Sequence, residues 1–192
     1  MKILAVDTAL GACSAAVLDG EKVLAHRFEP MERGHAERLA PMVEEVMREA
    51  AIAFPELQRL GVTVGPGTFT GQRIGIAFMR GLRVALKCPL TGVTTLEAMA
   101  RQAMAETGRR MGVALHDARR GEVYLGACEN GRERIAPKLE AVCDATGDVK
   151  QLALCESLVL CGTAAEWVLE LLADPSIALS SVRQPDALWV AR

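Results

Sequence analysis

Apolar and polar residues follow two different periods along this chain, which predicts strands followed by helices. Near the N-terminus, short apolar runs are separated by turn residues. The pair Asp19-Gly20 between two of these runs is typical of a tight β-hairpin, because both residue types tolerate positive φ. Further along, apolar residues recur three and four positions apart, which predicts helices. In the first half we expect strands at 2–8, 12–18, 22–29, 60–64 and 90–93, and helices at 39–50, 72–86 and 95–106.

The second half of the chain repeats the layout of the first. The matching pairs are Asp7 with Asp117, Gly11 with Gly121, and Asp19-Gly20 with Asn130-Gly131. We expect further strands at 132–139, 157–161 and 177–179, and helices at 146–155, 163–173 and 187–192. Both halves then have the order βββαβαβα, which indicates a duplicated α/β unit with lobes at 1–108 and 109–192. The alternative is chance similarity between two hairpins of one mixed α/β domain.

A doubled three-stranded meander followed by alternating helices and strands resembles the duplicated ribonuclease H-like, actin-like (ASKHA) fold of actin, Hsp70 and sugar kinases. The second lobe would be compressed and C-terminally truncated. In that group the first hairpin approaches nucleotide phosphates, so the resemblance implies a nucleotide-facing hairpin here. Its candidate residues are Asp7, Thr8, Gly11, Cys13 and Ser14. The alternative is that Asp7 and Asp117 each cap a strand-end turn through their own backbone.

Composition and charge narrow the range of partners. The chain has 192 residues, 51% of them apolar, which is enough to bury a core. Its net charge of −2 argues against tRNA binding by this chain alone, because phosphate neutralisation normally requires a basic face. No apolar run approaches the roughly 20 residues that span a membrane, and the first nine residues lack the apolar segment of a secretory signal. The six cysteines form no Cys-x-x-Cys pair, so we expect buried reduced thiols in a cytoplasmic protein.

The glycine-rich segment GPGTFTG stands between a predicted strand and a predicted helix. Its spacing differs from the dinucleotide fingerprint, and it lacks the lysine of a P-loop. Thr68 or Thr70 can cap the helix, whose first N–H groups can hold an anion. A purely structural tight turn is the alternative. The residues of this signature turn are Gly65, Pro66, Gly67, Thr68, Phe69, Thr70 and Gly71.

Five segments in order resemble the TsaB family of bacterial tRNA-modification proteins. They are ILAVDTALGACSAAVL, RGHAERLAPMV, GPGTFTGQRIGIAFMRGL, GVTTLEAMA and DARRGEVYLGA. The resemblance spans residues 2–126, and beyond residue 131 it depends on the fold pattern only. It implies a non-catalytic dimerisation subunit in the synthesis of N6-threonylcarbamoyladenosine next to the tRNA anticodon. The chain would pair with TsaD, which carries the chemistry and shares the fold, and the ATPase TsaE would join that pair.

The resemblance also implies that this chain has no catalytic residue and no metal of its own. TsaD-type proteins hold a metal through a His-x-x-x-His motif, and the matching stretch here has Thr94, Thr95 and Glu97 instead. The three histidines of the chain include no i, i+4 pair. No cofactor of its own is expected, weak ATP or ADP binding at a complex interface stays open, and tRNA would be reached only through the complex.

The helix after the glycine turn carries a ridge of small residues at Ala77, Gly81 and Ala85, which allows another helix to approach closely. By resemblance, this helix and the one before it form the partner interface, both in a homodimer of the isolated chain and in the competing TsaD heterodimer. The expected interface residues are His35, Leu39, Met42, Val46, Arg73, Ala77, Arg80, Gly81 and Ala85. Wholly intramolecular packing of the ridge is the alternative, as is a capping or solvent-exposed role for His35.

Two enzyme classes compete with the partner role. An actin-like ATP-dependent small-molecule kinase would need an acidic base, for which Asp7 and Asp117 are available. However, Arg119 and Arg120 stand where such kinases place small phosphate-binding residues. A peptidase is disfavoured, because the chain has neither His-Glu-x-x-His nor Gly-x-Ser-x-Gly.

Overall fold

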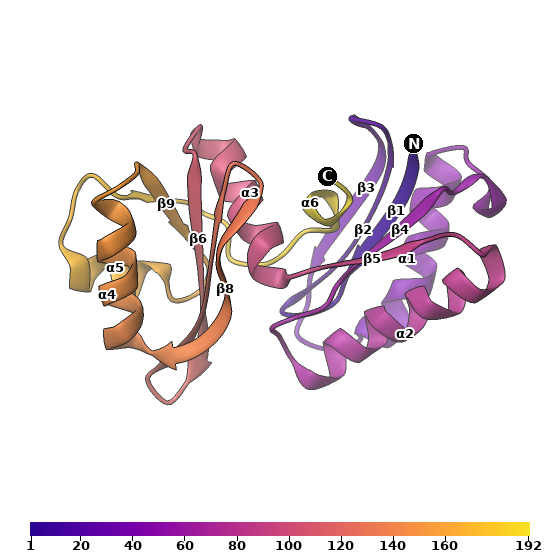
Figure 1. Ribbon diagram of the computed structural model, residues 1–192. Coiled ribbons are helices and arrows are strands. Elements are labelled where there is room, and N and C mark those ends of the chain that lie inside the picture. The colour runs from indigo at the N-terminus through magenta and orange to yellow at the C-terminus, as the bar shows by residue number, and fades with distance from the viewer. The chain divides into compact units, whose positions relative to one another are not determined.

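The computed structural model describes residues 1–192 and contains two five-stranded sheets, each with its own helices (Figure 1). The first half contains β1 (Lys2–Asp7), β2 (Ala12–Asp19), β3 (Lys22–Pro30), α1 (His35–Glu49), a 3-10 turn (Phe54–Glu56), β4 (Arg59–Thr63), α2 (Phe69–Leu86), β5 (Leu90–Val93) and α3 (Thr95–Thr107). The second half contains β6 (Met111–Arg119), β7 (Glu122–Glu129), β8 (Arg132–Ala141), α4 (Val142–Ala153), β9 (Leu158–Cys161), α5 (Ala165–Leu172), β10 (Ala178–Leu179) and α6 (Ala187–Ala191).

The two sheets have the same topology, which confirms the predicted duplication. Their strand orders are β3-β2-β1-β4-β5 and, written from the other edge, β8-β7-β6-β9-β10. In each sheet the first strand lies at the centre, antiparallel to the second strand and parallel to the fourth. The hairpin predicted at Asp19-Gly20 forms one position later, with Gly20 and Glu21 between the paired Asp19 and Lys22. The hairpin at Asn130-Gly131 forms as predicted, with positive φ at both residues.

Three helices begin earlier than the apolar period predicts. α1 begins at His35 rather than 39, α2 at Phe69 rather than 72, and α4 at Val142 rather than 146. Residues 35–38, 69–71 and 142–145, which precede the predicted starts, place no large apolar side chain fully in the core, so the 3.6-residue apolar period does not reach them. None of the helices is both long and apolar enough to span a lipid bilayer.

The first sheet is covered by helices on both faces. Leu4 and Val6 of β1 pack with α1 and α2, whereas Ile3 and Ala5 pack with α6. Because side chains alternate along a strand, covering both faces requires a nearly continuous apolar run, and β1 and β2 have such runs. In the second sheet, one apolar core joins β6, β7 and β9 to α4 and α5.

The compact units of the chain differ from the predicted lobes at two places. One unit contains residues 1–98 and 185–192, and the other contains residues 99–184. The third helix of the first half therefore continues into the second unit, and the last eight residues belong to the first unit. Ala187 N donates to Ser14 Oγ at 2.9 Å, which ties the start of α6 to β2. The predicted boundary at 108/109 was based on sequence order alone. Sequence order cannot show that the last residues of the chain pack in the first unit.

Candidate functional site

The chemistry of the first unit is concentrated where β1, β4 and β5 end, because parallel strands bring their carboxyl ends to one edge of the sheet. Asp7 ends β1 and is completely buried. Its Oδ1 accepts hydrogen bonds from Thr63 Oγ1 at 2.5 Å and from Ala9 N at 3.2 Å. The bond to Ala9 closes an Asx-turn, so Asp7 caps its own strand end, as the structural alternative predicted. Asp7 Oδ2 has no hydrogen-bond partner.

Burial raises the pKa of Asp7 to about 7. Loss of hydration is the largest cause, because a buried carboxylate is far less stable than a buried carboxylic acid. The hydrogen bonds from Thr63 and Ala9 lower the pKa, and the negative charge of Asp186 raises it slightly. Near neutral pH, Asp7 is therefore divided between its neutral and charged forms.

The glycine turn before α2 packs directly on the turn that follows Asp7. A β-carbon on Gly67 would lie 2.4 Å from Ala9 O, and one on Gly71 would lie 2.1 Å from Thr8 O. Two hydrogen bonds join the same segments: Thr68 N donates to Ala9 O at 2.8 Å, and Thr8 Oγ1 donates to Gly71 O at 2.7 Å. The glycines are therefore needed for backbone contact within the chain.

The N-terminus of α2 is capped from within the turn. Thr68 is the N-cap, and its Oγ1 accepts from Gly71 N at 3.1 Å, so the choice between Thr68 and Thr70 is settled. Gln72 N donates to Thr68 O at 3.1 Å. Internal acceptors thus use several of the donors that an anion would need, which favours the structural interpretation of this turn.

The residues predicted to face a nucleotide are already used inside the fold. Cys13 and Ser14 are fully buried, and Gly11 is only partly exposed. Cys13 Sγ lies 3.8 Å from Met42 Sδ in the apolar core, and burial raises its pKa to about 12. Ser14 Oγ accepts the hydrogen bond from Ala187 N. The hairpin therefore exposes none of these side chains, and nucleotide binding stays a prediction.

One hydrogen-bonded pair in the first unit was not predicted from the sequence. His26 Nε2 lies 2.7 Å from Asp186 Oδ1, across 160 positions of sequence. Together with Ser14 these are the residue types of a hydrolytic triad, but Ser14 Oγ is buried and bonded to backbone, with no hydrogen bond to His26. The pair connects β3 to the segment before α6 and gives a peptidase no activated nucleophile.

The second unit repeats the Asx-turn without repeating its surroundings. Asp117 Oδ1 accepts from Arg119 N at 2.7 Å, as Asp7 does from Ala9. Arg119 and Arg120 are exposed and have positive φ values of 74° and 57°. His116 is bonded to Thr163 Oγ1 at 3.1 Å, and burial lowers its pKa. Bulky arginines at this tip agree with the sequence argument against a kinase.

The segment that matches the metal motif of TsaD-type proteins forms a helix start. Thr94 Oγ1 accepts from Glu97 N at 3.1 Å, and Thr95 is completely buried. Among residues 1–192, no group of three or more His, Cys, Asp and Glu side chains is arranged to hold a metal. Four of the six cysteines are buried as expected, but Cys143 and Cys155 are exposed.

Four of the predicted interface residues are not on the surface. His35, Leu39, Met42 and Val46 of α1 are all buried. The three apolar side chains lie in the core against the first sheet, and His35 Nε2 lies 3.1 Å from Leu10 O. These four side chains are therefore used inside the fold, which argues against an exposed role for His35, and their part in an interface stays a prediction. Apolar periodicity shows that a helix face is buried but not what buries it.

The predicted interface residues of α2 do lie on its exposed side. These residues are Arg73, Ala77, Arg80, Gly81 and Ala85. A β-carbon on Gly81 would meet nothing within 4 Å. The intramolecular alternative for the ridge is therefore wrong.

The same side of α2 exposes two large apolar side chains that the sequence analysis did not select. Phe69 is 71% exposed and Val84 is 77% exposed. The Arg73 guanidinium lies 3.4 Å from the centroid of the Phe69 ring, a cation–π contact. The structure identifies both side chains as surface residues.

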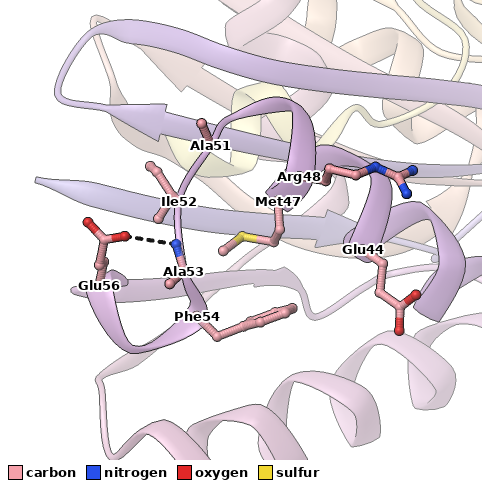
Figure 2. Close-up of a pocket in the computed structure, with 8 residues that line it drawn as sticks. All are labelled: Glu44, Met47, Arg48, Ala51, Ile52, Ala53, Phe54 and Glu56. Carbon is pink, nitrogen blue, oxygen red and sulfur yellow. Dashed lines mark hydrogen bonds between the residues drawn. The ribbon is translucent and has the colours of Figure 1, made fainter.

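A shallow pocket of about 510 Å³ lies where α1 ends (Figure 2). Met47, Ile52 and Phe54 form its apolar part, and Arg48 and Glu44 point away at its side. The Glu56 carboxylate accepts hydrogen bonds from Ala53 N at 2.8 Å and from Lys2 Nζ at 2.5 Å. A second pocket, of about 300 Å³, lies in the other unit. The first pocket has no histidine, cysteine or serine, and its only carboxylates are those of Glu44 and Glu56.

Comparison with solved structures defines the class of protein. Component A of (R)-2-hydroxyglutaryl-CoA dehydratase from Acidaminococcus fermentans aligns over 100% of this chain and 96% of its own, with a TM-score of 0.57 at 13% identity. YeaZ from Pseudomonas aeruginosa aligns over 98% of this chain and 88% of its own, with a TM-score of 0.79 at 31% identity. The chain is a duplicated ribonuclease H-like, actin-like (ASKHA) α/β protein.

Sequence comparison then gives the family. The family model described as "TsaD: tRNA N6-adenosine threonylcarbamoyltransferase" matches residues 22–173. The tRNA threonylcarbamoyladenosine biosynthesis protein TsaB of Escherichia coli (strain K12) is 42% identical over 124 residues, which is 65% of this chain. The chain belongs to the family that this model describes, on its TsaB branch. The match spans about half, 53%, of the length of the E. coli protein.

Replacing Gly71 tests the contact between the glycine turn and the Asp7 turn. Gly71→Ala places a methyl group against Thr8 O, so we expect it to lower the free energy of unfolding by about 2 kcal/mol or more. Gly81→Ala, in open space on the same helix, is the matched control and should raise it by about 0.5–1 kcal/mol. Urea unfolding followed by circular dichroism measures both; equal effects would contradict the packing argument.

Burial of Asp7 predicts that stability depends on pH. Its folded-state pKa is raised from 3.8 to about 7, so the folded state binds the proton more tightly and stability falls as pH rises through this range. Asp7→Asn removes the titration. Between pH 5 and 8, its stability relative to the wild type should therefore rise by on the order of 2–3 kcal/mol.

Chemical denaturation at several pH values measures this difference. Thr63→Val removes the hydrogen bond that lowers the pKa of Asp7. The decline in the stability of this variant should therefore extend to a higher pH than the decline in the wild type. A difference between Asp7→Asn and wild type that stays constant from pH 5 to 8 would show that Asp7 does not titrate there.

Proposed function

We propose that this chain is a non-catalytic partner subunit in the formation of N6-threonylcarbamoyladenosine next to the tRNA anticodon. In this proposal it binds a TsaD-type protein of the same fold, which carries the chemistry, and a TsaE-type ATPase joins through that protein. The biosynthetic role in the names of its TsaB relatives supports the pathway. One structural observation carries the partnership: the small-residue ridge of α2 is exposed and unoccupied.

The exposed side of α2 has the properties of a helix-docking surface. Along it, Ala77, Gly81 and Ala85 recur every four residues, so a second helix can approach at the short end of the usual 8–10 Å separation. Phe69 and Val84 lie near the two ends of the helix and supply large apolar contacts. Exposed aromatic and arginine side chains such as Phe69 and Arg73 are the types that most often anchor protein interfaces.

The contribution of α1 differs from the one predicted from sequence. Since its apolar face packs on its own sheet, α1 can offer a partner only its exposed side, which includes Ala40, Pro41 and Glu44. This side is small and acidic, whereas α2 is basic. A partner that covers both helices would need basic groups opposite α1 and acidic groups opposite α2.

The lack of catalysis in this proposal is supported by what the candidate groups already do. Asp7 is fully buried, Ser14 is bonded to backbone, and the glycine turn contacts its own chain. We propose no metal and no cofactor of its own. Weak ATP or ADP binding would require an interface that includes the partner, and tRNA would be held through the complex.

Self-pairing through the same surface would compete with the partner. Because a TsaD-type protein shares the fold, a homodimer and a heterodimer can use corresponding helices, and a homodimer of this kind would be isologous. The isolated chain would then be a dimer that the partner separates.

Combined Arg80→Glu and Gly81→Leu substitutions test the α2 surface. The larger side chain blocks close approach and the charge reversal repels an acidic partner, so we expect binding to a purified TsaD-type protein to weaken by about 100-fold or more. Arg132→Glu, an equal charge change on an exposed residue of the other unit, is the control and should bind normally. Isothermal titration calorimetry measures both, and unchanged affinity of the double variant would refute this docking surface.

A further inference from the structure

The exposed side of α5 carries two large apolar side chains. The buried side of this helix, with Ala165 and Val168, packs on the second sheet. On the exposed side, Trp167 is 41% exposed and Leu171 is 53% exposed. These two residues are four positions apart, so they are neighbours on one face of the helix. The outward face of a helix normally carries polar residues, so this pair leaves an unpartnered apolar patch in contact with water.

Two carboxylates form a second row along the same exposed side. Glu166 and Glu170 are also four positions apart, and each directly precedes one of the two apolar residues in the sequence. Glu170 is exposed and forms no ion pair. Glu166 is bonded to Arg183 at 2.6 Å, but its side chain remains 66% exposed. We call these four residues, Glu166, Trp167, Glu170 and Leu171, the α5 surface: an apolar row beside an acidic row.

The segment around α5 carries charge of one sign only. Arg183, which follows this segment, donates to Ser180 O at 2.6 Å as well as to Glu166, so it is already held within the chain. Residues 151–182 contain no Lys or Arg, but they contain the four carboxylates of Glu156, Glu166, Glu170 and Asp174. The α5 surface therefore offers negative charge that its own segment does not neutralise.

The position of Glu170 is unfavourable in the isolated chain. Glu170 lies in the last turn of α5, where unpaired carbonyl groups give the end of a helix a partial negative charge. A carboxylate is repelled there, and no basic residue in that turn offsets the repulsion. An external cation would interact favourably with both the carboxylate and the helix end. The placement of Glu170 therefore points to a positively charged partner, independently of the apolar row.

Charge and apolar contact together select the class of partner. The α5 surface repels the phosphates of nucleic acids and of anionic lipids, and a small cation would make no use of Trp167 and Leu171. Tryptophan is among the side chains that most often anchor protein interfaces. A helix with a row of Lys or Arg beside a row of apolar residues matches both rows of α5, because residues four apart have the same spacing on either helix.

We infer that the α5 surface binds a basic amphipathic helix of another protein. In this contact Trp167 and Leu171 pack against the apolar row of the partner helix, and the carboxylates of α5 pair with its Lys or Arg side chains. The α5 surface lies wholly within residues 99–184 and shares no residue with α2. The inference therefore goes beyond the proposed function, because it gives the chain a second docking surface, of opposite charge to the first.

The fluorescence of Trp167 in the full chain tests this inference. The chain has two tryptophans, so Trp189→Phe leaves Trp167 as the reporter. The probe is a synthetic helical peptide of about 18 residues with one row of Leu and one row of Lys. We expect it to shift the Trp167 emission to shorter wavelength and to protect Trp167 from quenching by acrylamide. Binding should be at least about tenfold weaker in about 500 mM salt than in about 50 mM salt.

Matched peptides and variants separate this surface from general attraction to an acidic protein. Peptides with every Lys replaced by Glu, or every Leu replaced by Ser, should bind at least about tenfold more weakly. Glu170→Lys and Leu171→Ser should each weaken binding of the Leu–Lys peptide by a similar factor. Glu133→Lys makes the same charge change at an exposed residue of β8, the edge strand farthest from β10 in the second sheet, and should bind like the parent protein.

Several outcomes would overturn this inference. They are an unchanged Trp167 signal with the Leu–Lys peptide, an equal response to the Glu peptide, and unchanged affinity of the Glu170→Lys and Leu171→Ser variants. Protection of Trp167 that grows with the concentration of the chain alone would assign the surface to a second copy instead. Protection by phosphatidylglycerol vesicles would assign it to a membrane. Glu170→Lys should bind a TsaD-type protein normally, so failure of this inference leaves the proposed function separately testable.

Discussion

The structure of the first unit depends on one close backbone contact, between the turn after β1 and the glycine turn before α2. A β-carbon at Gly67 or Gly71 would come within 2.4 Å of a carbonyl oxygen, so side chains are excluded at both positions. This contact fixes where α2 begins and turns its apolar side, including Gly75 and Met79, to the sheet. The opposite side, with Ala77 and Gly81, is then exposed as a direct consequence.

The same contact explains why the glycine turn, which resembles a phosphate-binding loop, is not open to a phosphate. In a phosphate site, glycines let a ligand approach backbone N–H groups. Here they let the chain approach itself, and Thr68 N and Gly71 N are bonded within it. Asp7 is enclosed beside this contact, and its burial raises its pKa to about 7.

Local signals in the sequence predicted the order of elements, the duplication and a threonine cap at position 68 or 70, because these depend on nearby residues. The burial of four predicted interface residues in the core of their own unit was not foreseen, because an apolar helix face such as that of Leu39 and Met42 has the same pattern whether it meets its own sheet or a partner. The His26–Asp186 pair and the return of the last eight residues to the first unit were missed. Both features join positions that are far apart in the sequence, and the spacing of apolar residues within one segment cannot predict such contacts.

The two halves keep one topology but have diverged in their surfaces. Their corresponding turns retain the Asx bond, at Asp7 and Asp117, while α2 of the first half is basic and α4 and α5 of the second half are acidic. In the proposed function, the surfaces of the duplicated fold bind a partner, and its buried polar residues stabilise the chain.

Reconstituted tRNA modification tests the central claim most directly. Threonylcarbamoyladenosine would be measured in tRNA incubated with a TsaD-type protein, its ATPase, ATP and the threonylcarbamoyl donor, with and without this chain. The account predicts no product from this chain alone, little from the partners alone, and efficient formation when all are present. Product from this chain alone, or equal yield without it, would contradict the account.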